Sequence, residues 1–253
     1  MKIILLAAGV GRRFGEQTKT LPKCLIPLGK NQETLLSRYF ESFRQLGLNR
    51  VVVVCGHQKE KLKKACKEFG HASKIQFIFN PRYREGSIVS LYSARKELNE
   101  DCLVMDADVY FPTAVLKKLL DSKHQTCFLV DRRTKSTGEE MMLMARRGRP
   151  VRISKTVDQG LKILGESIGF FKIQKKHAII LRKILEKWGQ DGKRGHVKSL
   201  TCPRFPSCPH QEYEESYNIL MQKVRVGTES TGKHFWTEMD FKEDLRKIQT
   251  RKA

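Results

Sequence analysis

A glycine-rich stretch near the start of the chain, at Gly9 and Gly11, is followed directly by two arginines. The apolar, partly β-branched run Ile3–Leu6 precedes the glycines and predicts a short buried strand. A strand that turns through glycines can point successive backbone N–H groups at an anion, and such a nest binds phosphate. Arginine forks match pairs of phosphate oxygens. The stretch therefore predicts a phosphate-binding loop that supplies its own positive charge.

Two well-known phosphate loops do not fit this spacing. The dinucleotide fingerprint is G-x-G-x-x-G, whereas here Gly15 follows Gly11 with three residues between them. The Walker loop requires G-x-x-x-x-G-K-[ST], which this sequence lacks. Lys23, preceded by the rigid Pro22, offers one more cation for a phosphate, although a single lysine in so basic a chain is usually a solvated surface residue.

Acidic residues that could hold a metal ion occur at two places in the sequence. Asp106 and Asp108 follow the apolar run Cys102–Met105, and at the end of a strand both carboxylates can turn toward a cleft. Capping of the next helix is an equally good interpretation of Asp106. Mg²⁺ typically takes one or two protein carboxylates plus substrate phosphates. Asp240 offers the second carboxylate, although on its own it would be interpreted as the cap of a helix over 241–248.

The composition limits the possible binding partners and the cellular compartment of the protein. The chain has 253 residues, 49 of them Lys or Arg and 27 Asp or Glu, so its formal net charge is +22. Nucleotides, phosphorylated metabolites, nucleic acids and membrane surfaces are all suitable anionic partners. The 7 scattered cysteines suit a reducing compartment better than a disulfide framework. No apolar run reaches about 18 residues and the N-terminal one is too short for a signal peptide, so we expect a cytoplasmic protein without a membrane span.

Strand-like and helix-like runs alternate along the chain. This alternation predicts an α/β fold with a doubly wound, mostly parallel sheet, helices on both faces, and a single domain over 1–253. Ligands bind beyond the carboxyl ends of such strands, where Gly9 and Asp108 both fall. The predicted strands are Ile3–Leu6, Val51–Cys55, Ile75–Phe79, Cys102–Met105, Cys127–Val130 and Ile168–Ile173. The predicted helices are Thr34–Leu46, His57–Phe69, Ser87–Leu98, Thr113–Leu120, Lys175–Trp188 and Phe241–Ile248.

The region 189–210 breaks the alternation and is predicted to be an inserted loop or lid. It contains Cys202 and Cys208, with His196 upstream. The C-x₅-C spacing is not the usual spacing of zinc ligands, so incidental cysteines in a loop are the preferred interpretation.

Taken in order, the motifs resemble those of the nucleotidyltransferase superfamily that activates sugar phosphates, whose pattern is L-A-A-G-x-G-x-R followed by P-K. Within it the chain is most similar to the bacterial choline-phosphate cytidylyltransferases and the cytidylyltransferases that use phosphonates such as 2-aminoethylphosphonate. The matches run from residue 4 to about 245 and are weakest over 187–210. They comprise LAAGVGRR at 6–13, PK at 22–23, NPRYREGSIVSL at 80–91, VMDADVY at 104–110, ISK at 153–155, GESIG at 165–169 and WTEMD at 236–240.

The resemblance implies a Rossmann-like nucleotidyltransferase fold and a role for each matched residue. Arg13 and Lys23 would neutralise phosphate charge during catalysis, Lys155 would meet the phosphate of the acceptor, and Arg12 occupies a variable position. Asp108 and Asp240 would bind Mg²⁺. The implied nucleotide-binding residues are Leu6, Ala7, Ala8, Gly9, Gly11, Asn80, Ser87, Ser90 and Asp106, and the acceptor-binding residues are Tyr110, Lys155, Glu166 and Trp236.

The implied reaction is a direct transfer. An acceptor phosphate or phosphonate oxygen attacks the α-phosphorus of CTP and pyrophosphate leaves. The acceptor is already anionic near neutral pH, so alignment and charge neutralisation suffice for catalysis.

The sequence leaves the acceptor open. A choline group would bind to aromatic rings, whereas a primary ammonium would prefer carboxylates. The sequence offers both, so phosphocholine and 2-aminoethylphosphonate stay equally open. The aromatic candidates are Tyr83, Tyr110, Phe111, Phe170, Tyr213, Tyr217 and Trp236, and the acidic ones are Glu139, Glu140, Glu214 and Glu215.

Other functions remain as alternatives. One is a sugar-1-phosphate nucleotidyltransferase that uses another nucleoside triphosphate. Another is a non-catalytic regulatory or nucleic-acid-binding homologue, which the sequence favours less because it shows the charge of a nucleic-acid binder without its motifs. A homo-oligomer is compatible with the sequence.

Overall fold

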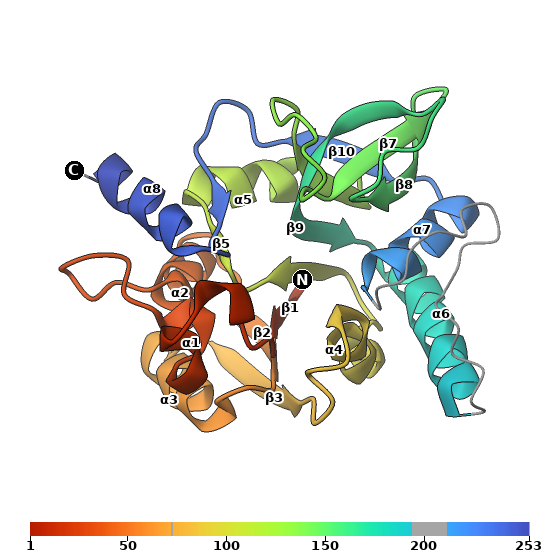
Figure 1. The fold of residues 1–253 in the computed structure, drawn as a ribbon. Coiled ribbons are helices and arrows are strands. Elements are labelled where there is room, and N and C mark those ends of the chain that lie inside the picture. The colour runs from red at the N-terminus through yellow and green to blue at the C-terminus, as the bar shows by residue number, and fades with distance from the viewer. Residues whose placement is uncertain (72, 194–211, 253) are drawn as a thin grey trace.

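A nine-stranded sheet runs through the middle of the computed structural model, which describes residues 1–71, 73–193 and 212–252 (Figure 1). Its main path has the order β10-β6-β9-β4-β1-β2-β3, and β7 and β8 extend it beside β9. A separate pair of short strands is formed by β5 and β11. The strands are β1 Lys2–Ala7, β2 Arg50–Cys55, β3 Lys74–Phe79, β4 Cys102–Asp106, β5 Val109–Tyr110, β6 Cys127–Asp131, β7 Met142–Arg146, β8 Arg149–Ser154, β9 Lys162–Ile173, β10 Gly227–Ser230 and β11 Thr237–Glu238.

Parallel pairing dominates one half of the sheet, as predicted. The pairs β1–β2, β2–β3, β1–β4 and β6–β10 are parallel, whereas β9 runs antiparallel to β4, β6 and β7. The carboxyl ends of β1 and β4 therefore lie side by side, with Leu6 opposite Asp106. This register brings the glycine-rich loop next to the loop that contains Asp108.

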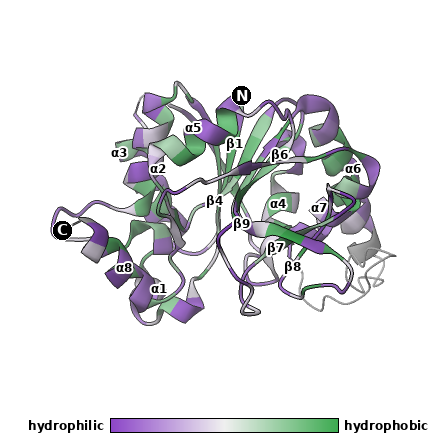
Figure 2. Ribbon diagram, turned by 90° about the horizontal axis from the view of Figure 1, so that it is seen from above, coloured by the Kyte–Doolittle hydropathy of each residue, from purple (hydrophilic) through white to green (hydrophobic). Residues whose placement is uncertain are grey.

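Helices cover both faces of the sheet, which confirms the predicted architecture (Figure 2). The side chains of β1 show why: Ile3 and Leu5 belong to the core under α2, α3 and α5, whereas Ile4 belongs to the core under α4, α6 and α7. Alternate residues of a strand point to opposite faces, so an apolar strand supplies both cores. The helices are α1 Gln17–Thr20, α2 Leu35–Gln45, α3 Lys59–Phe69, α4 Ser87–Ser93, α5 Thr113–Asp121, α6 Lys175–Lys193, α7 Glu214–Lys223 and α8 Lys242–Lys252.

Three predicted helices end elsewhere than expected, and one of them is α8, which continues to Lys252 instead of ending at Ile248. The helix predicted over Ser87–Leu98 stops at Ser93, whose hydroxyl donates to the carbonyl of Val89, and a separate turn of 3-10 helix follows at Arg95–Glu97. In contrast, α6 continues to Lys193, so the start of the loop predicted over 189–210 is helical. The remainder of that loop, with His196, Cys202 and Cys208, lies outside the described residues.

Five strands, β5, β7, β8, β10 and β11, and two α-helices, α1 and α7, were not expected from the sequence. β7 consists of Met, Leu and Ala rather than β-branched residues before its arginine, and β8 buries Arg152 completely between apolar neighbours. β10 has no apolar side chain, and α7 buries polar residues among its apolar ones, so no amphipathic stripe is visible in either sequence. In the described part of the chain, no helix has the length and apolar character needed to cross a membrane.

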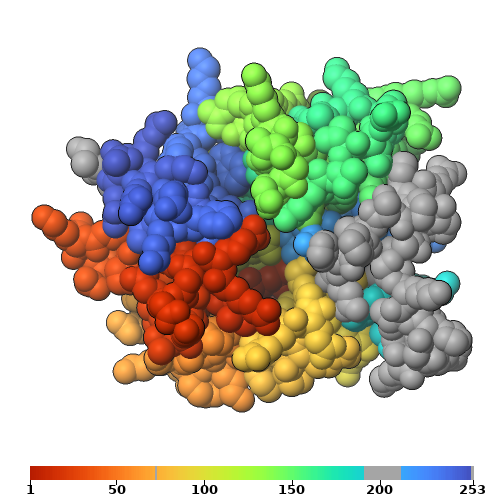
Figure 3. All heavy atoms as spheres, in the orientation of Figure 1, coloured from red at the N-terminus to blue at the C-terminus, as the bar shows by residue number. Residues whose placement is uncertain are grey.

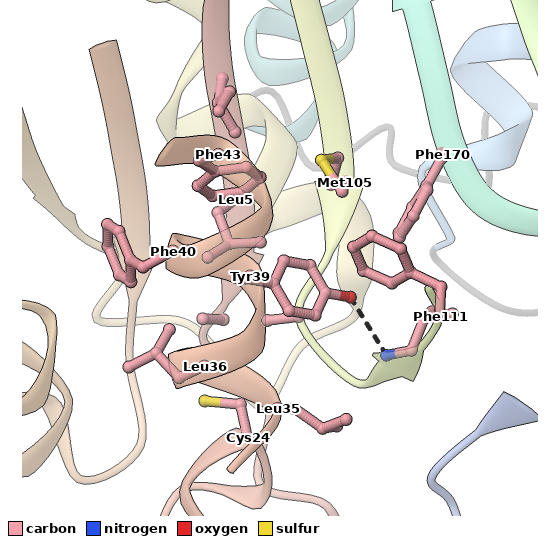
Figure 4. Packing of buried hydrophobic residues seen from close by; sticks show 14 of the residues in the cluster. Leu5, Cys24, Leu35, Leu36, Tyr39, Phe40, Phe43, Met105, Phe111 and Phe170 are labelled. Atoms are coloured by element: carbon pink, nitrogen blue, oxygen red, sulfur yellow. Dashed lines mark hydrogen bonds between the residues drawn. The ribbon is translucent and has the colours of Figure 1, made fainter. Parts of the chain in front are cut away.

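The buried tyrosine Tyr39 connects the core to the loop that follows β4 (Figure 4). Thr34 caps α2 through a reciprocal pair of hydrogen bonds with Ser37, and the apolar face of the helix then turns Tyr39 toward the sheet. The Tyr39 hydroxyl donates to the carbonyl of Asp106 at 2.7 Å and accepts from the N–H of Val109 at 3.2 Å. It therefore fixes both ends of the turn that contains Asp108.

Replacing Tyr39 with Phe should lower the free energy of unfolding by about 1–3 kcal/mol, because two buried backbone groups lose their partner. Chemical denaturation measures this change. Tyr83→Phe, at a half-exposed ring, is the control and should leave stability within about 0.5 kcal/mol. A Tyr39→Phe variant as stable as the wild type would show that the hydroxyl does not hold the turn.

Candidate active site

Two cavities open on the face formed by the carboxyl ends of β1 and β4, and Figure 3 shows this face hollowed at its centre. They meet at Ser87, Asp106, Asp108 and Tyr213, which line both. The first cavity is also lined by Leu6, Ala8, Gly9, Val10, Gly11, Arg12, Tyr83, Arg84, Gly86 and Ser90. The second is also lined by Arg13, Val109, Glu139, Met141, Lys155, Glu166, Ser167, Ile168, Gly169, Glu212, Glu214, Trp236, Glu238 and Asp240.

The glycine-rich loop forms one wall of the first cavity. Gly11 has φ +66°, a left-handed conformation that disfavours any side chain, and a Cβ there would lie 3.2 Å from Thr18 Cγ2 and 3.3 Å from Lys23 Cβ. The Thr18 hydroxyl lies within hydrogen-bond distance of the carbonyls of Gly11 and Gly15 and so holds the loop closed. The predicted loop residues line this wall with one exception, because Ala7 is buried in the core on the other side of the strand.

The opposite wall comes from the segment after β3 and from α4. Ser87 and Ser90 line this wall as the resemblance implied. Asn80 is completely buried and lies outside both linings. Its amide donates to Ser90 Oγ at 3.1 Å, and its carbonyl accepts from the N–H of Arg82 at 2.9 Å. Asn80 thus positions the wall from behind.

A cluster of opposite charges lies where the two cavities meet. Lys23 Nζ lies 2.6 Å from Asp108 Oδ2 and 2.7 Å from Asp240 Oδ1. Burial on its own would lower the pKa of the Lys23 ammonium. The negative charges of Asp108 and Asp240 have the larger combined effect, so the pKa of Lys23 is raised. Burial also opposes ionisation of Asp240, yet Lys23 and then Arg13 hold the pKa of that carboxyl below its usual range. Arg13 Nη2 lies 2.8 Å from Asp240 Oδ2.

The carboxylates around Lys23 form a set that suits a hard cation. Ligand oxygens of Asp108, Glu238 and Asp240 lie within 4.8 Å of one another. Asp108 Oδ1 is buried and has no hydrogen-bond partner among the described residues. Carboxylate oxygens are the ligands that Mg²⁺ prefers in proteins. The residues present therefore fit the expected Mg²⁺.

Glu238 is the member of this set that the resemblance did not supply, although it alternates with Asp240 in the sequence. It comes from β11, whose pairing with β5 brings Glu238 opposite Val109. Glu238 still reaches solvent, but its partial desolvation and the charges of Asp108 and Asp240 raise the pKa of Glu238 well above its usual range.

Asp106 is enclosed between the two cavities. It accepts a short hydrogen bond from the hydroxyl of Tyr213, whose backbone N–H donates to Ser87 Oγ at 3.0 Å. Gly169 packs so closely on the Asp106 carboxylate that a Cβ at this position would clash with it. Burial and then the charge of Asp108 raise the pKa of Asp106 to about 8, against the opposing effect of the Tyr213 hydrogen bond. Tyr213 had been noted in the sequence only as an aromatic ring.

The second cavity contains three of the four predicted acceptor residues, Lys155, Glu166 and Trp236. The fourth, Tyr110, lies outside its lining; its ring packs beside Phe235 at 5.9 Å and under the guanidinium of Arg38 at 4.5 Å. The side chain of Tyr110 thus packs beside the β5–β11 pair.

A buried carboxylate fixes Trp236 in this cavity. The indole N–H of Trp236 donates to Asp131 Oδ2 at 2.8 Å, and Arg133 forms a forked ion pair with the same carboxylate. Asp131 lies opposite Glu166 in the β6–β9 pair. Burial first, and then the charges of Glu140 and Asp131, raise the pKa of Glu166 to about 7.

Comparison with known proteins finds a family whose model matches most of the chain. The model of the MobA-like NTP transferase domain matches residues 3–168. The choline-phosphate cytidylyltransferase of Streptococcus pneumoniae is 32% identical over 111 residues, which cover 44% of this chain and 45% of that protein. The CMP-5'-(3-aminopropyl)phosphonate synthase of Streptomyces rubellomurinus is 30% identical over 120 residues, 47% of this chain and 19% of that protein. The chain thus spans less than half the length of either relative.

A solved structure extends the likeness to the whole fold. The structure of CTP:phosphocholine cytidylyltransferase from Streptococcus pneumoniae superposes with a TM-score of 0.72, covering 100% of this chain and 99% of that one. The two sequences are 20% identical in this superposition, so the likeness concerns the fold alone.

Replacing Lys23 with Met should destabilise the metal-free protein by about 3 kcal/mol, because it leaves neighbouring, largely buried carboxylates without their cation. Added Mg²⁺ should then raise the melting temperature of the variant more than that of the wild type, because the cation takes the vacated position. Thermal unfolding with and without Mg²⁺ measures both effects. Lys19→Met removes an exposed lysine and is the control. If Mg²⁺ raised the melting temperatures of Lys23→Met and the wild type by the same amount, the lysine and the cation would not compete for one position.

Proposed function

The chain belongs to the MobA-like NTP transferase family, and on that premise we propose that it transfers the cytidylyl group of CTP to a small phosphate or phosphonate acceptor that carries an ammonium group. The observation that supports this most is the meeting of the two cavities at Asp106 and Asp108, beside Lys23. One cavity has a glycine-rich wall and the other a charged wall, as two different substrates require. The choice of CTP as the nucleotide rests on the names of these two relatives.

The shared boundary of the cavities suits a direct transfer between bound substrates. With CTP along the glycine-rich loop and the acceptor beside Lys155, the acceptor oxygen faces the α-phosphorus. A bond forms between these two atoms while the bond from the α-phosphorus to the bridging oxygen breaks, and pyrophosphate leaves with that electron pair. Holding the reacting atoms in line replaces a bimolecular encounter by a unimolecular step.

Charge neutralisation is the second contribution of the chain. Lys155 and Arg13 line the acceptor cavity and counter the charge of the incoming phosphate. Lys23 lies where the α-phosphate would be attacked and stabilises the charge that develops there. Asp108, Asp240 and Glu238 would hold Mg²⁺, which when bound neutralises phosphate charge and polarises the phosphorus centre.

The composition of the acceptor cavity favours a primary ammonium on the acceptor. Its lining includes the carboxyl groups of Glu139, Glu166, Glu212 and Glu214. The aromatic rings in its lining are those of Tyr213 and Trp236, fewer than a cage around a quaternary ammonium would use. An acceptor of the 2-aminoethylphosphonate type thus has more support than phosphocholine, and a neutral sugar phosphate has less support than either.

Pyrophosphate release tests the proposal. CTP, UTP, GTP and ATP are each combined with phosphocholine, 2-aminoethylphosphonate or a hexose 1-phosphate in the presence of Mg²⁺. We expect turnover with CTP and an ammonium-bearing acceptor, reduced about 100-fold or more in Asp108→Asn. Asp121→Asn, at an exposed ion pair with Lys117, is the matched control.

The other outcomes of this experiment separate the alternatives. Turnover with the hexose 1-phosphate would make the chain a sugar-phosphate nucleotidyltransferase. Folded protein that is silent in every combination but retains RNA or DNA at physiological salt would support a nucleic-acid binder instead.

Acceptor binding should release protons near pH 7. The pKa of Glu166 is raised to about 7 in the free protein, and a bound ammonium would lower it, so the carboxyl ionises on binding. Calorimetric titration in buffers of different ionisation enthalpy measures the released protons.

The variant Glu166→Gln is the control for this linkage. It should abolish the proton release. A carboxyl pKa that is raised in the folded protein costs stability progressively as the pH rises from the ordinary pKa of the group to the raised one, so the full cost is present above about pH 7. Glu166→Gln should therefore also raise the melting temperature at pH 8 and leave it nearly unchanged at pH 5. Proton release that persists in this variant would assign the titration to another group.

A further inference from the structure

We propose that Asp244, in the first turn of α8, is a positioning residue that sets the direction of the Asp240 carboxylate at the candidate Mg²⁺ site. This inference rests on the proposed function and deepens it, because it names a residue that would control metal binding without touching the metal. It also gives α8 a functional role, although no described residue of that helix lines either cavity.

The side chain of Asp240 points at cations and not at the helix that follows it. Its Oδ1 lies 2.7 Å from Lys23 Nζ, and its Oδ2 lies 2.8 Å from Arg13 Nη2. On the residues alone, Asp240 is interpreted as the cap of this helix. A capping aspartate turns its carboxylate toward backbone N–H groups. Another residue must therefore serve those groups if Asp240 is to serve the site.

Asp244 takes over the capping role. Its Oδ2 accepts hydrogen bonds from the backbone N–H groups of Asp240 at 3.1 Å and of Phe241 at 2.8 Å. An acidic residue at the third position of a helix can reach back in this way to the residue that precedes the helix. The two N–H groups belong to the peptide units on either side of the Asp240 Cα. Their bonds to one oxygen thus set the direction in which the Asp240 side chain leaves the backbone.

The carboxylate of Asp244 is itself held in place. Its other oxygen, Oδ1, accepts from Lys247 Nζ at 2.9 Å, about one turn further along α8. Asp244 is buried, and a buried carboxylate is tolerated where hydrogen bonds and a cation compensate its charge. Both oxygens are therefore in use, which fixes the orientation of the carboxylate.

The first turn of α8 has a fixed place beside the glycine-rich loop. Met239 precedes this turn and Ile248 follows it, and both are fully buried in the core under α2, α3 and α5. Lys242 runs along the loop, since a Cβ at Gly15 would lie 3.9 Å from Lys242 Cε. Figure 3 shows the dark blue C-terminal segment against the red N-terminal one. Asp244 thus transmits the position of a docked helix to a candidate metal ligand.

This support matters most when Lys23 moves. The Lys23 ammonium holds the Asp240 carboxylate as long as it lies between Asp240 and Asp108. Once Lys23 withdraws to let a cation in, the backbone bonds from Asp244 decide where the Asp240 carboxylate lies. Groups that orient metal ligands contribute strongly to metal affinity, and their loss typically weakens binding by about 10- to 100-fold.

Binding of Mn²⁺ alone to the full chain tests the inference, and the electron paramagnetic resonance signal of free Mn²⁺ measures it. Asp244→Ala should weaken Mn²⁺ binding by about 10-fold or more. Asp244→Asn can present its oxygen to the same two N–H groups, so its affinity should stay within about 3-fold of the wild type. Glu243→Ala makes the same charge change at an exposed residue of the same turn and is the matched control, with unchanged affinity.

The melting temperature separates positioning from stability. Asp244→Ala should lower it, because two backbone N–H groups lose their partner. A purely structural role would lower the melting temperature and leave the Mn²⁺ affinity of the folded protein unchanged. Asp244→Ser, whose hydroxyl can accept one of the two bonds, should have an intermediate Mn²⁺ affinity, and it replaces Asp244→Ala if that variant does not fold.

Three results would overturn the inference. The first is wild-type Mn²⁺ affinity in the folded alanine or serine variant of Asp244. The second is a loss in Asp244→Asn as large as that in Asp244→Ala, because the effect would then come from charge. The third is wild-type Mn²⁺ affinity in Asp240→Asn. Failure of the proposed function looks different: the wild type then releases no pyrophosphate with any nucleotide and acceptor, while its Mn²⁺ affinity still reports on Asp244.

Discussion

The contact of Lys23 with Asp108 and Asp240 is the interaction on which the site depends. It joins the turn after the glycine-rich loop to the end of β4 and to a segment 217 residues further along the chain. Carboxylates this close repel one another strongly where water is scarce, and an ammonium between them removes most of that cost. The same lysine would have to release these carboxylates for a metal ion, which leaves it free to bind phosphate. The site is thus held together by the ion pairs of Lys23, a group that would also take part in the proposed reaction.

The fold brings these charges together through strand direction. The parallel strands β1 and β4 end at the same edge of the sheet, so the glycine-rich loop and the turn that contains Asp108 are adjacent. The antiparallel strand β9 adds Glu166 and Gly169 from the other side. Tyr39 secures the turn from the core, so a buried side chain determines where Asp108, a candidate metal ligand, lies.

The parts of the fold that the sequence predicted are those with regular patterns. The strand before Gly9 is a continuous apolar run, and α2 buries one face at helical spacing, so both were found with ends close to the observed ones. α7 could not be found in this way, because it buries polar residues: Asn218 bonds the backbone of Ile153 from within the core. Its neighbour Tyr213 was therefore expected only as one of several candidate aromatic rings, and its hydrogen bond to Asp106 was not.

The structure brings Asp108 and Asp240 together around Lys23, and their place in the candidate site came from the resemblance, because on the residues alone Asp240 would be interpreted as a helix cap. The candidate site was not predictable where the role depends on a side-chain direction. Asn80 matches a nucleotide-binding motif but supports the wall from behind, and Arg12 and Arg13 are neighbours in sequence that face different cavities. Such directions follow from local backbone geometry, here the single turn of 3-10 helix Arg12–Phe14, which the sequence pattern does not encode.

A crystal structure with a non-hydrolysable CTP analogue and Mn²⁺ tests the central claim most directly, because anomalous scattering locates the metal independently of the protein. We expect a manganese peak bound by Asp108 and Asp240, the Lys23 ammonium withdrawn from between them, and the triphosphate in the cavity lined by Gly9 and Ser90. A nucleotide bound elsewhere, or manganese away from these carboxylates with Lys23 unmoved, would contradict this claim.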